Sequence, residues 1–283
     1  MAHSRKGLNK VHTNQVRPIP RTPGQGPTNY GRTLQPHAYV AVVLADLPIA
    51  YWRLQEDPRE VLAKDSSPYQ QHLRIMDKGG GFTQTTGAIA GSTAFTFPAS
   101  IAAWMAGGVR NPNPAAWNTA SLEGWLKTSM ANDGNGQFWF HAQDQGTGNN
   151  TLTSGHIQTA GTPRLRLTWN NTSADHVITT SFADGAWHHV VFTYSATTDV
   201  STLYLDGVVS SAVALVATNI GALTAVLGHE VDGAVTQAGG GFATNQAWNG
   251  SMHDIAVYNY ELSAQQVETH YRTAQLPTPK QFI

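Results

Sequence analysis

Short runs of β-branched and aromatic residues follow one another closely from residue 120 onward, and most of them end at Gly, Asn or Asp. Such runs suit a pleated surface whose side chains alternate between two faces. Many short strands with turn residues between them favour a sandwich over a parallel α/β sheet. The runs that we expect to be strands are 121–127, 137–142, 164–169, 188–194, 202–205, 208–215, 225–228 and 252–258.

Residues 187–194 show the alternation most clearly. A period of two places His188, Val190 and Phe192 on one face and His189 and Val191 on the other. Because the two histidines point to opposite faces, they cannot share one metal ion, and we expect them to pack beside the neighbouring tryptophan.

Two helical segments flank the strands. Ser263 and Gln266 form an expected capping box at the start of a C-terminal helix, and Leu262 and Val267 form the hydrophobic staple. Prolines at 277 and 279 end this helix near residue 273. A short helical turn is expected from residue 38 to the proline at 48, followed by a strand over 49–54.

The first part of the chain is basic and rich in proline. Residues 1–45 hold six basic residues and no acid, which leaves 11 basic and 18 acidic residues in the remainder. Five of the 14 prolines lie within residues 1–36, where they prevent a helix or a central strand. We therefore expect an extended arm over 1–37, a domain over 38–275 and a tail over 276–283. The basic residues expected to bind a partner are Arg5, Lys6, Lys10, Arg17, Arg21 and Arg32.

The absence of cysteine excludes disulfides, cysteine-ligated zinc and thiol catalysis. No run of 18 apolar residues is present, so we expect no membrane-spanning segment. The first 37 residues also lack the apolar region of a signal peptide. A protein without such a signal leaves a cell by lysis or through a dedicated machine, or stays inside.

Several segments together resemble one family. They are 51–54 (YWRL), 65–67 (DSS), 121–126 (SLEGWL), 184–194 (DGAWHHVVFTY), 203–207 (LYLDG), 250–259 (GSMHDIAVYN) and 261–271 (ELSAQQVETHY). These motifs are similar to those of the laminin-G-like, concanavalin A-like lectin/glucanase superfamily. The resemblance implies an all-β fold, a two-sheet antiparallel jelly-roll sandwich, here with an extended N-terminal arm and one short C-terminal helix. An acidic pair of the family is replaced by His253 and Asp254, which puts its role in holding a loop or an ion in doubt.

The resemblance also bears on catalysis and on metal binding. Glucanases of the superfamily carry two catalytic glutamates on one strand, and no segment here matches that pattern. Glu123 is alone on its strand, so we expect a structural acid at a strand end and no enzyme. Calcium is common in the superfamily, but turn chemistry explains two of the candidate aspartates. We therefore name no ligand and expect no cofactor, with calcium as the alternative. The candidate aspartates are Asp144, Asp184, Asp206, Asp232 and Asp254.

Two further groups of residues bear on partners. Trp104, Trp117 and Trp248 lie in Gly-, Asn- or Pro-containing contexts, where they either stack on sugar rings or plug the ends of the sandwich; we favour plugging. The arm could neutralise phosphates, wrap over acidic neighbours or remain a solvated tail. Tyr30 is its one aromatic residue, so we expect no stacking on single-stranded nucleic acid and favour wrapping.

Together these features predict a structural protein of a bacteriophage virion. Such a protein is assembled in the host cytoplasm and released by lysis. The arm would anchor it to other virion subunits, in a homo-oligomeric arrangement, and the lectin-like domain would project outward. It would be a capsid decoration protein, a minor capsid protein or a tail protein, and capsid decoration is favoured over a tail position. The alternative is a glycan-binding adhesin or receptor-binding module for host-surface glycans. A glucanase-like enzyme is the third hypothesis.

Overall fold

A computed structural model of the chain describes residues 37–77, 81–98, 103–112, 117–129, 136–143, 152–159, 162–178, 182–221, 223–229, 231–232, 241–242 and 246–277. The chain divides into two compact units, residues 1–35 and 36–283, and every described residue belongs to the second. The expected arm therefore lies outside the described residues, apart from His37. The same holds for the six basic residues assigned to it, which are Arg5, Lys6, Lys10, Arg17, Arg21 and Arg32.

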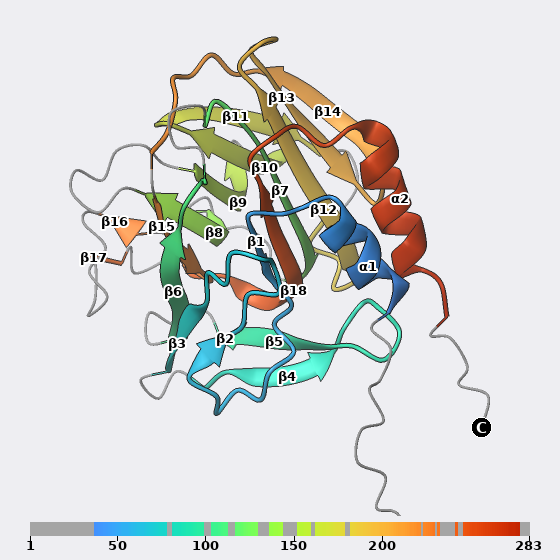
Figure 1. Ribbon diagram of the computed structural model, residues 1–283. Coiled ribbons are helices and arrows are strands. Elements are labelled where there is room, and N and C mark those ends of the chain that lie inside the picture. The colour runs from blue at the N-terminus through green and yellow to red at the C-terminus, as the bar shows by residue number, and fades with distance from the viewer. Residues whose placement is uncertain are drawn as a thin grey trace, which may run out of the picture. The chain divides into compact units, whose positions relative to one another are not determined.

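Two eight-stranded sheets, antiparallel throughout, form the second unit (Figure 1). The first contains β1 (Ala50–Trp52), β4 (Thr83–Thr86), β5 (Thr93–Pro98), β7 (Thr119–Lys127), β12 (Trp187–Ser195), β13 (Val200–Leu205), β14 (Val208–Ala214) and β18 (Asn249–Tyr258). Its order is β14-β13-β12-β7-β18-β5-β4, and β1 also pairs with β18.

The second sheet contains β2 (Leu62–Ala63), β3 (Leu73–Asp77), β6 (Ala103–Val109), β8 (Gln137–Gln143), β9 (Leu152–Thr159), β10 (Thr162–Trp169), β11 (Thr172–Val177) and β15 (Leu223–Leu227). Its order is β11-β10-β9-β8-β15-β6-β3-β2. A separate pair joins β16 (Val231–Asp232) to β17 (Gly241–Phe242). The two large sheets confirm the expected sandwich, and all eight runs expected to be strands lie on strands.

The main apolar core lies between the two sheets. Val190 and Phe192 of β12 contribute to it from the first sheet, and Leu165 and Leu167 of β10 from the second. Trp169 packs edge-on against Trp117, with ring centroids 6.4 Å apart. Burial of each large apolar side chain contributes roughly 1.5–3 kcal/mol, so this core supplies most of the driving force for the sandwich.

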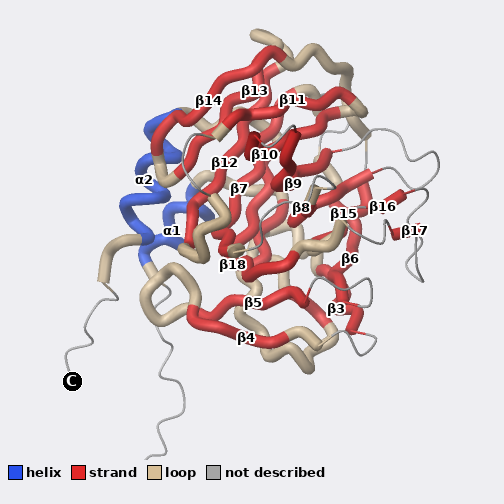
Figure 2. Tube along the Cα trace, turned by 180° about the vertical axis from the view of Figure 1, so that it is seen from behind, coloured by secondary structure: helices blue, strands red, loops and turns tan. Residues whose placement is uncertain are grey.

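Two helices cover the outer face of the first sheet (Figure 2). They are α1 (Ala38–Ala45) and α2 (Ala264–Ala274), and both pack on a second apolar cluster that includes Trp125 and Val191. Ser263 caps α2, because its hydroxyl accepts from the backbone of Gln266 while the Gln266 side chain accepts from the backbone of Ser263. The expected capping box is thus confirmed, and so is the helical segment before residue 48. These helices make the domain three layers deep.

The two ends of the described domain are tied together. His37 caps α1, where its Nδ1 accepts from the backbone N–H of Tyr39 at 3.2 Å. Because Nδ1 accepts, Nε2 carries the proton and donates to the carbonyl oxygen of Leu276 at 2.9 Å. One histidine therefore joins the residue before α1 to the residue just past α2.

Neither helix in the described part of the chain is long and apolar enough to cross a bilayer. They have 8 and 11 residues, whereas a membrane-spanning helix needs about 20.

Candidate binding site

A buried carboxylate lies beneath the two helices, at the middle of β7. Glu123 is fully buried and points to the helix-covered face of the sheet. The Tyr39 hydroxyl of α1 donates to its Oε1 at 2.8 Å, and the Tyr258 hydroxyl of β18 donates to its Oε2 at 2.7 Å. His189 Nε2 lies 2.8 Å from Oε1. Three elements thus converge on one acid.

His270 of α2 links this acid to a second one. Its Nδ1 lies 3.1 Å from both carboxylate oxygens of Glu123, and its Nε2 lies 2.9 Å from Oδ2 of Asp46. Burial alone would lower the pKa of His270, but the charges of Glu123 and Asp46 and their hydrogen bonds outweigh it and raise the pKa to about 9. The ring is therefore an imidazolium at neutral pH that donates to a carboxylate from each nitrogen.

The same pair keeps Glu123 ionised. Burial would raise the pKa of Glu123, but the charge of His270 and the hydrogen bonds from His189 and His270 hold it well below its usual range. A carboxylate fixed in this way has no proton to donate, and an imidazolium with both N–H groups engaged has no lone pair to accept one. The cluster is suited to holding two helices on a sheet. Glu123 is a structural acid, as expected, but it lies at the centre of its strand and not at an end.

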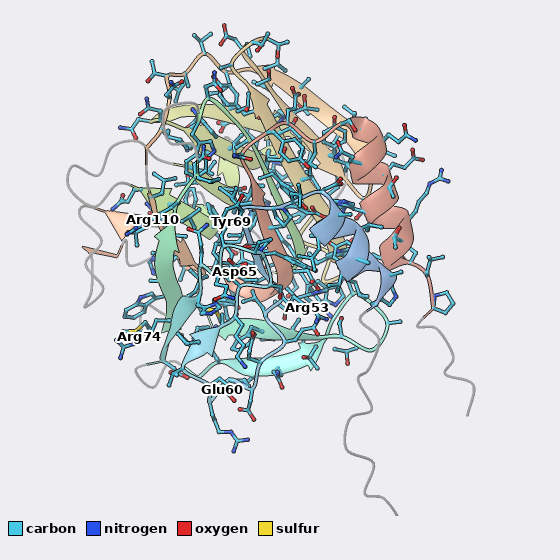
Figure 3. The ribbon with its side chains drawn as sticks, in the orientation of Figure 1. Arg53, Glu60, Asp65, Tyr69, Arg74 and Arg110 are labelled. Atoms are coloured by element: carbon cyan, nitrogen blue, oxygen red, sulfur yellow. The ribbon has the colours of Figure 1, made fainter. Side chains whose placement is uncertain are left out.

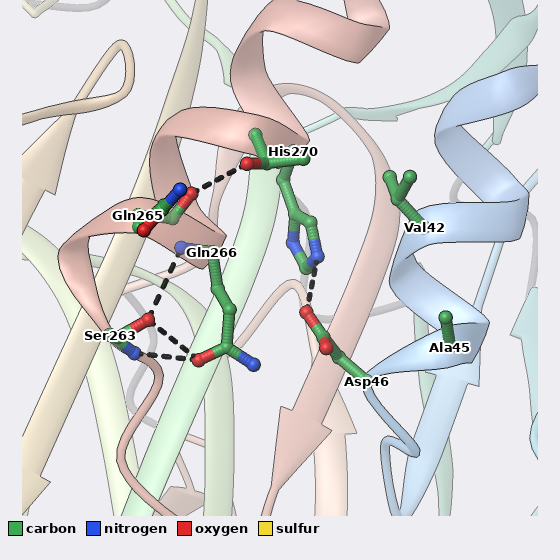
Figure 4. Close-up of a pocket in the computed structure, with 8 residues that line it drawn as sticks. Val42, Ala45, Asp46, Ser263, Gln265, Gln266 and His270 are labelled. Atoms are coloured by element: carbon green, nitrogen blue, oxygen red, sulfur yellow. Dashed lines mark hydrogen bonds and ion pairs between the residues drawn. The ribbon is translucent and has the colours of Figure 1, made fainter.

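A pocket of about 290 Å³ opens between the two helices, directly above His270 (Figure 4). One wall is formed by Val42 and Ala45 of α1 and by Asp46, the residue that follows this helix. The other wall is formed by polar side chains at the start of α2. Asp46 is the acidic side chain among the lining residues, and its Oδ2 lies 2.9 Å from His270 Nε2. Glu123 is fully buried and does not line the pocket.

The substituted acidic pair also has a defined structural role. Asp254, fully buried, accepts from the hydroxyl of Tyr51, and its Oδ2 lies 2.6 Å from His253 Nδ1. His253 Nε2 accepts from the backbone N–H of Ala88 at 2.9 Å, so the proton of this ring lies on Nδ1 and is donated to Asp254. The pair thus fixes the turn at residue 88 against β18.

Two other candidate calcium ligands lie in turns around one histidine. His188 Nδ1 is 2.9 Å from Asp206 Oδ2, and His188 Nε2 is 3.3 Å from Asp184 Oδ1. The hydrogen bond to Asp206 raises the pKa of His188. Asp184 also accepts from the backbone N–H of Ala186, as expected of an aspartate in a turn. Asp206 begins the Asp-Gly turn with a φ of 53° and accepts from the backbone N–H of His189 on β12. Among the side chains that the structure describes, no three His, Asp or Glu are placed to hold a metal ion. Asp144 and the side chain of Asp232 are not among them.

The sequence itself matches one protein family. The profile described as the concanavalin A-like lectin/glucanases superfamily (Laminin_G_3) matches residues 106–268, which is more than half of the chain. The chain belongs to this superfamily. No curated protein sequence matches it significantly.

Solved structures show the same lectin-like fold at low sequence identity. The receptor-binding domain of botulinum neurotoxin C/D mosaic serotype is 16% identical, with a TM-score of 0.56 over 80% of this chain and 51% of that one. The binding domain of Paraclostridial Mosquitocidal Protein 1 is 13% identical, with a TM-score of 0.56 over 81% and 52%. The ligand-binding domain of botulinum neurotoxin serotype D, solved with N-acetylneuraminic acid, is 16% identical, with a TM-score of 0.55 over 83% and 52%. The lectin-like chain therefore spans about half the length of these binding domains.

The three tryptophans considered for sugar stacking are all buried in the lectin-like domain. Trp117 and Trp248 are fully buried, and Trp104 is 5% exposed. Trp117 and Trp248 belong to the core between the sheets, and Trp104 packs with Val226 in a smaller cluster. Their burial leaves little ring surface for stacking on a sugar.

The described part of the lectin-like domain exposes one aromatic side chain, Tyr69, at 48%. Tyr69 lies in a turn that Asp65 braces: the carboxylate accepts from the backbone N–H of Tyr51, Ser67 and Gln71 at 2.6–2.8 Å. Gln71 also bonds the backbone of Arg110, which brings that exposed residue beside the turn (Figure 3). The family-like segment 65–67 marks this part of the chain in the sequence, but the exposure of Tyr69 depends on what the rest of the chain leaves uncovered.

Proposed function

We propose that this chain is a non-enzymatic structural protein of a bacteriophage virion, with a capsid-decoration, minor capsid or tail position. Its arm, residues 1–37, anchors it to other virion subunits, and the lectin-like domain is displayed. The observation that carries this proposal is the separation of charge along the chain. Six basic residues and no acid precede residue 46, and 18 acids against 11 basic residues follow. A cationic segment and an acidic domain attract each other between neighbouring copies or subunits.

The buried cluster supports a role without catalysis. Glu123 is the acid that the family motif places on a central strand, and here it is enclosed by two tyrosines and two histidines. An acid that solvent and substrate cannot reach does not serve glycoside hydrolysis, which needs two accessible carboxyl groups across the scissile bond. The domain then serves as a displayed binding module whose helices are fixed to the sheet by this buried cluster.

Incorporation into virions is tested with a tagged full-length chain and a tagged variant that lacks residues 1–36. Each is supplied in cells during phage infection, and the particles are purified on a density gradient. We expect the full-length chain to migrate with the particles and the shortened chain to stay at the top, while circular dichroism shows both to be folded. Absence of the full-length chain from the particles overturns the proposal.

A second candidate function is recognition of host-surface glycans, and the Tyr69 turn favours it. Sugar rings stack on exposed aromatic faces, and a turn held by three backbone bonds to Asp65 presents its side chain with little loss of conformational entropy on binding. The exposed Arg110 beside it supplies a cation for an acidic sugar. A neighbour in fold, the neurotoxin serotype D domain, was solved with N-acetylneuraminic acid, so sialylated glycans are the first probes.

A glycan array with residues 37–283 separates this candidate from the first. We expect binding by the wild-type domain, loss with Tyr69→Ala and retention with Tyr69→Phe, which keeps the ring. Binding by both the wild type and Tyr69→Phe would show that the aromatic ring is needed and the hydroxyl is not. Equal binding by Tyr69→Ala and wild type would show that the Tyr69 turn is not part of the glycan site. Absence of binding to every glycan on the array would reject the glycan-binding function and leave the virion role as the proposal.

A further inference from the structure

Gln71 holds the Tyr69 turn against the first strand of the domain. Its backbone N–H donates to Oδ2 of Asp65 at 2.6 Å, and its carbonyl oxygen accepts from the indole Nε1 of Trp52 at 2.7 Å. Trp52 is fully buried on β1. The backbone of Gln71 is therefore fixed to the core, and the exposed ring of Tyr69 lies two residues before it in the sequence.

The side chain of Gln71 fixes a second exposed residue. Its Oε1 accepts from the backbone N–H of Arg110, and its Nε2 donates to the carbonyl oxygen of Arg110 at 3.3 Å and to that of Ile49 at 2.6 Å. One amide thus pairs with both backbone groups of the residue that follows β6, as a residue of a neighbouring strand would. Tyr69 and Arg110 are consequently held on one support (Figure 3).

The guanidinium of Arg110 is available to a ligand. Arg110 is exposed, and its side chain forms no ion pair with any residue that the structure describes. Other exposed arginines do pair: Arg59 with Asp57 and Arg272 with Glu268, both at 2.6 Å. Because arginine carries five N–H donors in a planar fork, Arg110 can meet two acceptor oxygens at once.

We propose that Arg110 gives the Tyr69 turn a preference for sugars that carry a carboxylate, and that Gln71 is the residue that positions it. The inference rests on the glycan-binding candidate and deepens it by naming the class of sugar and the two residues that select it. The ring of Tyr69 takes the apolar face of the sugar, and the guanidinium donates two parallel hydrogen bonds to the carboxylate oxygens. A neutral sugar keeps the ring contact and loses these two bonds.

The preference has to arise from contact with Arg110, because the net charge of the domain opposes it. Acids outnumber basic residues after residue 45, so long-range attraction does not bring an acidic glycan to this surface. A single exposed ion pair contributes little, whereas two hydrogen bonds to a charged group beside a stacking ring contribute more. We expect the acid to bind roughly tenfold more tightly than its neutral form.

Titration calorimetry with matched sugars measures this preference on the full-length chain. The probes are sialyllactose and trigalacturonate, each compared with its methyl ester, which lacks the negative charge. We expect the wild type to bind at least one acid more tightly than its ester, and Arg110→Gln to bind that acid only as tightly as the ester. Arg74→Gln is the matched control and should keep the preference, because Arg74 is an exposed arginine on β3, away from the turn (Figure 3).

Gln71→Ala tests the positioning role. The substitution keeps the two backbone bonds that hold the turn and removes the side-chain bonds to Arg110 and Ile49. We expect the affinity for the ester to be unchanged and the affinity for the acid to fall towards it. Equal weakening of both forms would show that Gln71 only supports the turn, and would contradict the positioning role. Thermal unfolding confirms that each variant is folded.

The outcomes separate this inference from the functions on which it builds. Equal binding of acid and ester by the wild type, or equal losses with Arg110→Gln and Arg74→Gln, overturns the inference. Binding of neutral glycans alone, lost in Tyr69→Ala, would reject the role of Arg110 and leave the glycan-binding function in place. Absence of binding to every glycan would reject both. The arm is unchanged in all these variants, so incorporation into virions should not differ among them.

Discussion

His270 of α2 and Glu123 of β7 lie 147 residues apart in the sequence, and the histidine Nδ1 is 3.1 Å from both carboxylate oxygens. Both side chains are almost wholly buried. The pair therefore fastens the C-terminal helix to the centre of the sheet, and α1 is fastened to the same acid through Tyr39. Removal of one partner from such a pair leaves the other charge buried without compensation.

Glu123→Gln keeps the shape of the side chain and removes its charge. We expect the free energy of unfolding to fall by about 3–5 kcal/mol, because the imidazolium of His270 loses its buried counter-charge. Urea denaturation followed by tryptophan fluorescence measures the change. Glu261→Gln is the control: this acid is exposed, and its loss should change stability by less than about 0.5 kcal/mol. Similar values for the two variants would show that the pair contributes nothing.

The alkaline stability of the domain should depend on His270. Its pKa is about 9 in the folded protein, above the value of 6.5 for a free histidine. The folded state binds the proton more tightly, so the stabilisation is complete below pH 6.5 and is lost as the pH rises through 9, up to roughly 3 kcal/mol. The melting temperature of the wild type should fall over this range, whereas that of His270→Gln should start lower and fall less, because the raised pKa of His188 leaves a smaller slope. A flat wild-type profile between pH 6.5 and 9.5 contradicts the assignment.

The stability of the domain at acidic pH should depend on two other histidines. Burial lowers the pKa of His156 and of His176 to about 4. The unfolded chain binds protons more tightly at these sites, so stability is complete above pH 6.5 and is lost as the pH falls to 4. Protonation of Glu123 adds to the loss below its usual pKa, because its folded pKa is lowered. Unfolding in guanidinium between pH 4 and 7 should show this slope, and His176→Gln should reduce it.

Gly207 forms the hairpin between β13 and β14 with a φ of +81°, which favours glycine. An added Cβ would also lie 2.8 Å from the ring of Tyr271 on α2. Gly207→Ala should therefore lower the free energy of unfolding by about 1–3 kcal/mol. Gly221→Ala is the matched control, since open space surrounds that position and its φ is not positive, and it should be neutral or slightly stabilising. Equal effects of the two variants on the urea midpoint would contradict this account.

Local sequence patterns were enough to predict many of the strands and both helices. Asp206 and Gly207 predict their hairpin because both adopt positive φ there, at 53° and 81°. The capping box at Ser263 and the alternation in β12 were likewise visible in sequence. The strands between residues 62 and 109 were not predicted. In β4 the sequence TQTT has no apolar residue, whereas LRIMD in β3 does alternate and was missed. The turn from β10 to β11 did carry a signal, since Asn170 and Asn171 adopt φ of 44° and 62°.

The buried site was less predictable than the strands. The motif around Glu123 identified its strand and its structural role. Its partners lie far along the chain, on Tyr39 and His270, and no local spacing relates them. The exposure of Tyr69 has the same origin, because a side chain becomes accessible only where distant segments fail to cover it.

The bond from His37 to the carbonyl of Leu276 brings the domain's first and last described segments to one point. The backbone at residue 37 and the backbone at residue 276 therefore lie close enough to be joined by a short segment. A permuted chain that joins residue 276 to residue 37 through a short linker and opens elsewhere should retain the native sandwich. The same geometry would let the whole domain be inserted into a surface loop of an unrelated host protein.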